Sequence, residues 1–234
     1  EVKAAGNAFL EMRNRIERHI EQRTLILSGV SHDLRTPLTR LKLGISLLDI
    51  DDKEPLERDL EEMGLMLDEF LTFAKAQDNE KSNFELLSVS SILESLDADY
   101  KRLGAKLDIA KNKNSGSYLM RPSLIRRALD NIIGNALRYG TLANLKVIID
   151  EDHINFIIED NGPGIPAEML SEALKPFSRL DPARNQDNGM GVGLGLPIAS
   201  DIAQAHGGSL RLVKSKEYGG LRVELIISAK RQIT

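Results

Sequence analysis

Apolar residues in the first third of the chain recur every three or four positions, which is the spacing of one face of an α-helix. One such stretch runs from Phe9 to Leu48 and a second from Leu56 to Ala74. A polar segment that ends in Pro55 separates them and is typical of a turn that opens a new helix. The sequence therefore predicts two long helices that fold back on each other as a hairpin.

Each predicted helix carries a full apolar stripe, and a single hairpin cannot bury both stripes. In the second helix the apolar steps alternate between four and three residues, which is the seam of a coiled coil. We expect two chains to pair, so that their four helices form a dimeric bundle. A monomer whose hairpin packs on its own second domain is the alternative.

The helical periodicity ends in the polar residues 75–83, which we interpret as a linker. Beyond it, short runs typical of strands alternate with helical patterns. Helices are expected at 90–103, 122–139, 167–173 and 195–206, and strands at 84–89, 106–110, 117–120, 144–150, 154–159, 209–213 and 221–227. The helix at 122–139 has one apolar face, formed by Leu124, Ile125, Ala128, Leu129, Ile132, Ile133 and Ala136. This order predicts a two-layer α/β sandwich after the helical hairpin, so the fold class is α+β with two domains.

Composition narrows the classes of function. The 234 residues include 31 Lys and Arg against 35 Asp and Glu, and the net charge of −4 argues against a nucleic-acid-binding surface. The chain has no Cys, which excludes disulfides, cysteine nucleophiles and Cys-based zinc sites. No apolar run is long enough to span a bilayer, and the chain starts without Met in a helical pattern. We therefore expect a soluble fragment of a longer protein.

The candidate chemistry of the first helix lies in residues 31–38, Ser-His-Asp-Leu-Arg-Thr-Pro-Leu. The apolar seam places His32 near the opposite, solvent-facing side, with Asp33 beside it and Thr36 one helical turn later. His32 is a candidate nucleophile, and the alternative is an ordinary surface histidine. A serine-protease triad is excluded, because consecutive helical residues point about 100° apart and the chain has no G-x-S-x-G motif.

Polar side chains of the predicted helix at 122–139 recur away from its apolar face. Asn131, Asn135 and Arg138 follow one another by four and three residues, and Tyr139 comes next. A carboxamide oxygen suits Mg²⁺ that carries phosphates, arginine pairs with phosphate oxygens, and a tyrosine ring packs on a base. This face is a candidate for binding a nucleotide with its metal ion.

Two glycine-containing segments can form the rest of such a site. Residues 160–165, Asp-Asn-Gly-Pro-Gly-Ile, follow an apolar strand; the glycines let a flat ligand approach, and Asp160 can accept a hydrogen bond from an exocyclic amine. Residues 189–196, Gly-Met-Gly-Val-Gly-Leu-Gly-Leu, lead into a helix whose first amides can hold phosphates. The chain has no Rossmann, Walker or Ser/Thr/Tyr-kinase motif.

These segments together resemble the motifs of bacterial sensor histidine kinases, of the EnvZ type in particular. Residues 31–38 resemble the H box, and with their flanks (29–43) they look like the EnvZ type. Residues 131–140 resemble the N box, 160–165 the G1 box and 189–196 the G2 box, and Pro-Phe-Ser-Arg at 176–179 resembles the F box. The order agrees with the family over almost the whole chain. The first nine residues look like the end of a HAMP signalling helix, with a plain amphipathic helix as the alternative.

The resemblance implies a division into domains. It predicts the end of a HAMP-like helix at 1–14, a dimerisation and histidine phosphotransfer domain at 15–78, a linker at 79–83, and a catalytic ATP-binding domain of the GHKL (Bergerat) type at 84–234. The chain would then be the cytoplasmic portion of an inner-membrane receptor.

The resemblance also implies an activity. ATP, bound with Mg²⁺, would phosphorylate His32, with Asp33 as the base that orients the ring. Thr36 would serve in dephosphorylating a response regulator, and Asn135 with Asn131 would hold the Mg²⁺. The further ATP-binding residues would be Arg138, Tyr139, Asp160, Gly162, Gly164, Ile165, Phe177, Arg179, Gly191, Val192, Gly193, Leu194, Gly195 and Leu196.

The expected partners are a second copy of the chain and the receiver domain of a response regulator, OmpR-like by the same resemblance, which also points to osmolarity as the stimulus. An aspartate of the regulator would take the phosphoryl group. Two other classes of function stay open. One is a catalytically inactive dimeric scaffold that senses nucleotide, and the other is a GHKL-type ATPase that uses water as the acceptor.

Overall fold

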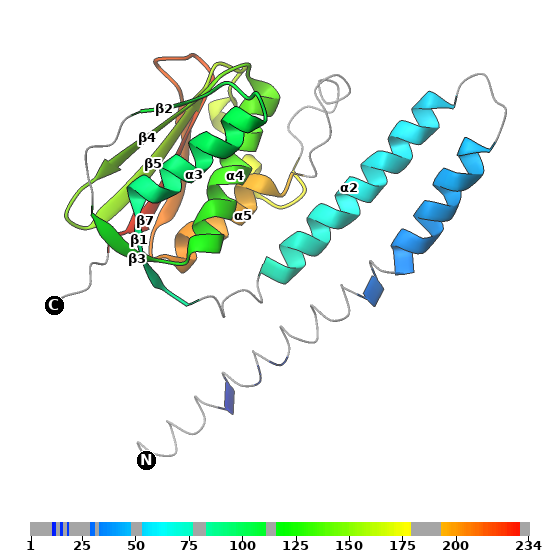
Figure 1. Ribbon diagram of the computed structural model, residues 1–234, viewed down its shortest axis with the longest axis horizontal. Coiled ribbons are helices and arrows are strands. Elements are labelled where there is room, and N and C mark those ends of the chain that lie inside the picture. Colours follow the sequence, from blue (N-terminus) through cyan, green and yellow to red (C-terminus); the bar gives the residue numbers. More distant parts are fainter. Residues whose placement is uncertain are drawn as a thin grey trace. The chain divides into compact units, whose positions relative to one another are not determined.

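The computed structural model describes residues 11–12, 15, 18, 29–30, 33–47, 53–76, 83–110, 116–178 and 193–229 (Figure 1). The chain divides into two compact units, Glu1–Lys81 and Ser82–Thr234, and each is described by itself. The predictions for the first ten residues, His32, Arg179, Gly191 and Val192 lie outside the described residues.

The first unit is a helical hairpin, as the periodicity predicts. Residues 33–46 are helical, and α2 spans Glu54–Ala76 with acidic residues in its first turn, where they complement the positive end of the helix dipole. Lys42 Nζ and Glu61 Oε1 lie 2.8 Å apart and join the two helices. This hydrogen bond and the charge of Lys42 lower the pKa of Glu61.

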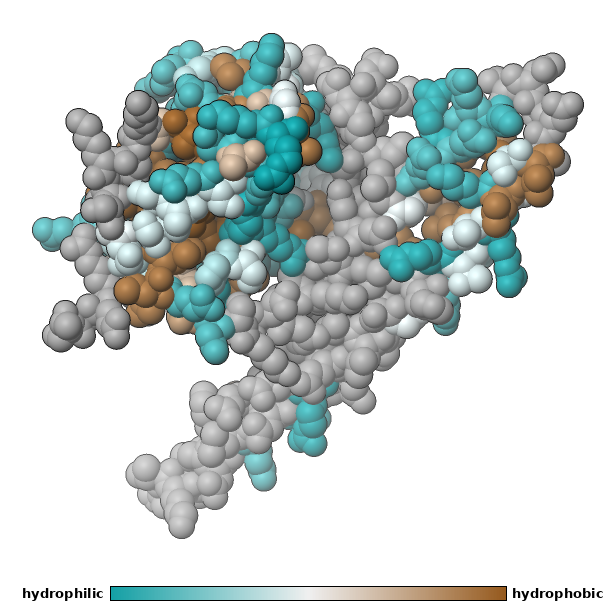
Figure 2. Space-filling model, in the orientation of Figure 1, coloured by the Kyte–Doolittle hydropathy of each residue, from teal (hydrophilic) through white to brown (hydrophobic). Residues whose placement is uncertain are grey.

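The apolar stripes of the hairpin are only partly covered. A groove of about 460 Å³ lies between the two helices and is lined by Arg35, Leu38, Thr39, Lys42, Leu60, Glu61, Gly64 and Leu67. Eight other apolar residues in the described part of this unit remain between 45% and 84% exposed: Met12, Val30, Leu34, Leu41, Leu43, Leu47, Leu56 and Met63. Figure 2 shows the resulting hydrophobic surface on the hairpin helices. The hairpin thus retains apolar area that a single copy does not bury.

The second unit is the predicted two-layer α/β sandwich. Its main sheet has the strand order β2-β4-β5-β7-β6. The strands are β2 (Leu107–Ile109), β4 (Ala143–Ile149), β5 (His153–Asp160), β6 (Ser209–Lys214) and β7 (Leu221–Ser228). Only the pairing of β2 with β4 is parallel among these neighbours, as the sequence expectation of mostly antiparallel strands allows. A separate antiparallel pair consists of β1 (Glu85–Ser88) and β3 (Ser117–Met120).

Three helices lie side by side on one face of the main sheet: α3 (Val89–Arg102), α4 (Pro122–Tyr139) and α5 (Gly195–Ala205) (Figure 1). The buried residues of α4 are the seven that its apolar face predicts. In β5, Asp160 shares one side of the strand with the fully buried Ile154, Phe156 and Ile158, because side chains alternate along a strand. The carboxylate of Asp160 therefore lies at the end of the row of buried core residues on this side of β5.

The predicted helix at 167–173 is wrong. The structure has two single 3₁₀ turns instead, η2 (Ala167–Met169) and η3 (Glu172–Leu174). Of the residues in these turns only Ala173 is buried, so the segment has no apolar face that would stabilise a longer helix. The first strand is also shorter than expected, because α3 already begins at Val89. None of the described helices combines the length and the apolar character needed to cross a membrane.

His206 follows α5 and is buried, with 5% of its surface exposed. Its Nδ1 lies 2.8 Å from the carbonyl oxygen of Ile202, and its Nε2 accepts the backbone N–H of Arg121 at 3.1 Å. Only the neutral ring with its hydrogen on Nδ1 makes both bonds. Phe84 packs edge-on against the ring, with centroids 5.5 Å apart. Burial lowers the pKa of His206; the bond to Ile202 acts in the opposite direction, and the charge of Arg121 lowers it further.

We expect the second unit to lose stability as the pH falls through 6.5, the ordinary pKa of histidine. Because the pKa of His206 is lower in the folded chain, the unfolded chain binds a proton more readily below that pH, so protonation favours unfolding. Urea unfolding of wild type and His206→Gln between about pH 7.5 and pH 5.5 measures this effect. The substitution should weaken the pH dependence, whereas His153→Gln, which removes an exposed imidazole, should leave it intact. The same pH dependence in all three proteins would contradict the assignment.

Candidate nucleotide-binding site

The carboxylate of Asp160, the last residue of β5, is the most buried charged group proposed for the site, with 4% of the residue exposed. Its Oδ1 accepts the backbone N–H of Gly162 at 2.8 Å and that of Leu221 at 3.1 Å. Burial raises the pKa of Asp160, while these two N–H bonds act in the opposite direction. No donor of the described residues bonds Oδ2, so this oxygen can accept a hydrogen bond from a ligand.

Glycines surround this carboxylate because no side chain fits there. A Cβ on Gly162 would lie 2.8 Å from the carbonyl oxygen of Tyr139 and 2.9 Å from Asp160 Oδ1. A Cβ on Gly220 would collide with Asp160 Oδ1. Gly164 has φ +70°, and a Cβ there would approach the carbonyl oxygen of Gly220 to 3.3 Å. The G1 segment and the turn before β7 thus pack backbone against backbone.

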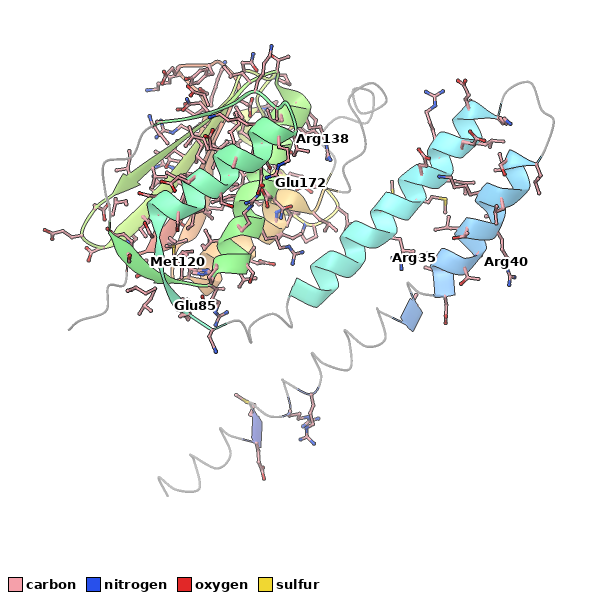
Figure 3. The ribbon with its side chains drawn as sticks, viewed as in Figure 1. Arg35, Arg40, Glu85, Met120, Arg138 and Glu172 are labelled. Carbon is pink, nitrogen blue, oxygen red and sulfur yellow. The ribbon has the colours of Figure 1, made fainter. Side chains whose placement is uncertain are left out.

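The polar side of α4 carries the predicted phosphate and base contacts. Asn131, Asn135 and Arg138 are half-buried, and Tyr139 is 37% exposed. Nδ2 of Asn131 is buried and has no hydrogen-bond partner among the described residues. A buried amide without a partner costs stability, so a polar ligand at this position would satisfy it. Arg138 lies near the C-terminal end of the helix (Figure 3).

The start of α5 brings Gly195 of the G2 segment to this helix. Gly195 is the first residue of α5, and a Cβ on it would lie 3.7 Å from the Cβ of Asn131. Leu194 and Leu196 are buried and anchor the turn, with 1% and 8% exposed. The N-terminus of this eleven-residue helix therefore lies beside Asn131, and its dipole favours an anion there.

A backbone hydrogen bond joins the F segment (176–179) to the G2 segment (189–196). Phe177 donates its N–H to the carbonyl oxygen of Gly193 at 3.1 Å, and both residues have positive φ, +64° and +74°. A Cβ on Gly193 would lie 2.6 Å from the carbonyl oxygen of Ser178, so only glycine fits. The ring of Phe177 is 52% exposed. The segment 179–192, which includes Arg179, Gly191 and Val192, lies outside the described residues.

The structure therefore brings together three of the predicted groups: the α4 face, the end of β5 and the start of α5. Ile165 is half-buried beside Gly164. Two features of the site were not predicted, the N–H of Leu221 and the close approach of Gly220, because both come from a turn 60 residues away from Asp160. A third is the side chain of Asn161, which bonds the turn after α4.

In the first unit, Asp33 and Thr36 are both exposed on the described helix 33–46. Helical geometry places them three residues apart on one side of the helix. The hydroxyl of Thr39 donates a hydrogen bond to the carbonyl oxygen of Arg35 at 2.9 Å, which is a contact within the same helix.

Comparisons with known proteins agree with this arrangement. Residues 22–79 match the family of His Kinase A (phospho-acceptor) domains, and residues 120–231 match the family of histidine kinase-, DNA gyrase B- and HSP90-like ATPases. The sensor histidine kinase GtrS of Pseudomonas aeruginosa is 34% identical over 96% of this chain and 46% of its own length. CpxA of Escherichia coli is 31% identical over 95% of this chain and 50% of its own length. The solved histidine kinase domain of the E. coli osmosensor EnvZ is 30% identical, with a TM-score of 0.50, over 65% of this chain and 92% of that one.

The chain belongs to the sensor histidine kinases, with a phosphoacceptor helical region followed by an ATP-binding domain of the GHKL type. It spans about half the length of the curated relatives it matches.

Replacing Asp160 by Asn should weaken the binding of ATP by about ten- to 150-fold, since a hydrogen bond to a charged group contributes about 1.5–3 kcal/mol. The amide keeps an oxygen for the two backbone N–H groups but replaces the second oxygen, which can accept a hydrogen bond, by an NH₂ that can only donate. Because burial disfavours the native carboxylate, the fold should be no less stable. Calorimetric titration and thermal unfolding measure both effects.

Asp150→Asn is the matched control, since the exposed Asp150 also accepts two backbone N–H bonds through Oδ1, from Asp152 and His153. It should bind ATP like the wild type. Equal affinity of the Asp160→Asn and wild-type proteins would remove Asp160 from the site.

Proposed function

We propose that this chain is the kinase portion of a two-component sensor, an ATP-dependent protein-histidine kinase that phosphorylates its own His32. The observation that carries the proposal is that one chain matches both family domains, with His32 inside the first match and the Asp160 site inside the second. We assign residues 15–78 to the dimerisation and phosphotransfer domain and residues 84–234 to the catalytic domain.

In the proposed site, adenine lies against the G1 segment, and its amine donates to Oδ2 of Asp160. The ring of Tyr139 packs beside the nucleoside. Arg138, the orphaned amide of Asn131 and the first amides of α5 bind the phosphates. The amide oxygens of Asn135 and Asn131 are suited to hold Mg²⁺, which when bound neutralises phosphate charge and orients the triphosphate.

The chemical step is a phosphoryl transfer. A neutral ring nitrogen of His32 attacks the γ-phosphorus of ATP, the bond from that phosphorus to the bridging oxygen breaks, and ADP leaves with the electron pair. Asp33 accepts a hydrogen bond from the other ring nitrogen, orients the ring and takes up its proton as positive charge develops.

The exposed apolar residues of the hairpin support a homodimer. Two copies that pack these stripes together bury the area left open in one hairpin and form a four-helix bundle. The phosphorylated His32 then passes its phosphoryl group to an aspartate of a response regulator. We assign the exposed helix face at Asp33 and Thr36 as the docking site for the regulator. In the cell the chain would be the cytoplasmic portion of an inner-membrane receptor.

Incubation with γ-labelled ATP and Mg²⁺ tests the proposal. The wild-type chain should acquire an acid-labile, alkali-stable label, and His32→Gln should lose it entirely because the acceptor nitrogen is gone. His153→Gln, which changes an exposed histidine of the second unit, should be labelled like the wild type.

Two other results would replace the proposal. Release of free phosphate without labelled protein would identify an ATPase that uses water as the acceptor. ATP binding without any turnover would identify a nucleotide-sensing scaffold.

Thr36→Ala should keep autophosphorylation within about two-fold of wild type but lose most phosphatase activity toward the phosphorylated regulator. A hydroxyl one turn after His32 can position the water that attacks the aspartyl phosphate. Thr39→Ala is the control, since its hydroxyl bonds the helix backbone, and it should keep both activities. Parallel loss of both activities in Thr36→Ala would refute this role.

A further inference from the structure

The side chain of Asn161 bonds the turn that follows α4. Its Oδ1 accepts the backbone N–H groups of Thr141 at 2.8 Å and Leu142 at 3.1 Å, and its Nδ2 donates to Thr141 Oγ1 at 2.9 Å. The orientation of the amide follows from these contacts, because a flipped group would turn NH₂ toward two N–H donors. One exposed side chain therefore makes three hydrogen bonds to a segment 20 residues away.

The two backbones approach each other closely at this point. A Cβ on Gly140 would lie 2.8 Å from Asn161 Oδ1 and 3.2 Å from the nitrogen of Gly162. A Cβ on Gly162 would lie 2.8 Å from the carbonyl oxygen of Tyr139. The end of α4 and the start of the G1 segment are thus in direct contact, and the amide of Asn161 joins them. A shift of α4 along or about its axis would break the three bonds together.

Different parts of the nucleotide site lie on the two sides of this junction. Asp160, which precedes Asn161, is the proposed adenine acceptor, and α4 carries the proposed phosphate contacts Asn131, Asn135 and Arg138. A nucleotide binds tightly only when both parts are correctly spaced, since a small displacement of one part leaves its contacts unmade.

We propose that Asn161 is a positioning residue that holds the adenine-binding end of β5 and the phosphate-binding face of α4 at the spacing of one nucleotide. The proposal rests on the ATP site proposed above. It predicts that Asn161 matters for ligands that span both parts and has little effect on ligands that occupy only one.

The test compares the affinities of Mg²⁺-ADP, which uses both the adenine part and the phosphate contacts of α4, and adenosine, which has no phosphates and so makes none of the contacts proposed for Asn131, Asn135 and Arg138. In Asn161→Ala the affinity for ADP should fall about ten-fold or more, the result of losing several hydrogen bonds that act together. The affinity for adenosine should fall less than about three-fold. Calorimetry suits ADP, and an NMR titration suits the weaker adenosine. A merely structural role would not change the ratio of the two affinities.

Three further variants make the test specific. Asn161→Asp keeps an oxygen for both backbone N–H groups, and the Thr141 hydroxyl can donate to it, so most of the ADP affinity should return. Thr141→Val removes one bond of the three and should give a smaller loss of ADP affinity than Asn161→Ala, which also covers the case in which Asn161→Ala does not fold. Asn144→Ala is the matched control, because its amide bonds Asp108 at 3.3 Å on the neighbouring strand, and it should bind both ligands normally.

Equal losses for ADP and adenosine in the Asn161 and Thr141 variants, or no loss for either, would overturn the positioning role. A wild-type chain that binds neither ligand would instead overturn the ATP site itself, so the two failures are distinguishable.

Discussion

The constraint on which the nucleotide site depends is the burial of one carboxylate, that of Asp160. A charged group with 4% exposure must be hydrogen-bonded to be tolerated in a fold. The two donors that satisfy Oδ1, the N–H groups of Gly162 and Leu221, come from different segments of the chain. The end of β5, the G1 turn and the start of β7 must therefore keep one arrangement, and that arrangement leaves the second oxygen for a ligand. The hydrogen bonds that hold these three segments together thus also orient the carboxylate oxygen that is left for a ligand.

The glycines of the site follow from this constraint. Gly162 and Gly220 both stand where a Cβ would meet the carboxylate of Asp160, and Gly140 stands where one would meet the amide of Asn161. A glycine-rich segment before a helix is commonly interpreted as room for phosphates, and the start of α5 fits that interpretation. Around Asp160 the glycines serve first to let three backbone segments pack together, and the opening for a flat base is the consequence.

What the sequence could predict depends on the range of the interactions. The buried face of α4 follows from local periodicity, and all seven predicted residues are buried. The segment 167–173 has helix-forming residues but almost nothing to bury, so propensity alone misled the prediction. The sequence places Asn161 in the G1 motif but assigns it no role, because its partner Thr141 lies 20 residues earlier in the chain, before β4 and β5. Contacts of that kind leave no periodic trace in the sequence.

The two units differ in how much of their apolar surface a single chain buries. The second unit covers its sheet with three helices and encloses its core, with residues such as Phe156 and Leu225 fully buried. The hairpin ties its helices with the exposed pair Lys42 and Glu61, and an exposed ion pair stabilises little. Its stability must come from the apolar stripes, which a single copy leaves open, and the phosphoacceptor family it matches is a dimerising one. The nucleotide site is thus set by contacts within one chain, whereas the hairpin that carries the proposed phosphoacceptor leaves apolar residues exposed, which the proposed dimer would bury.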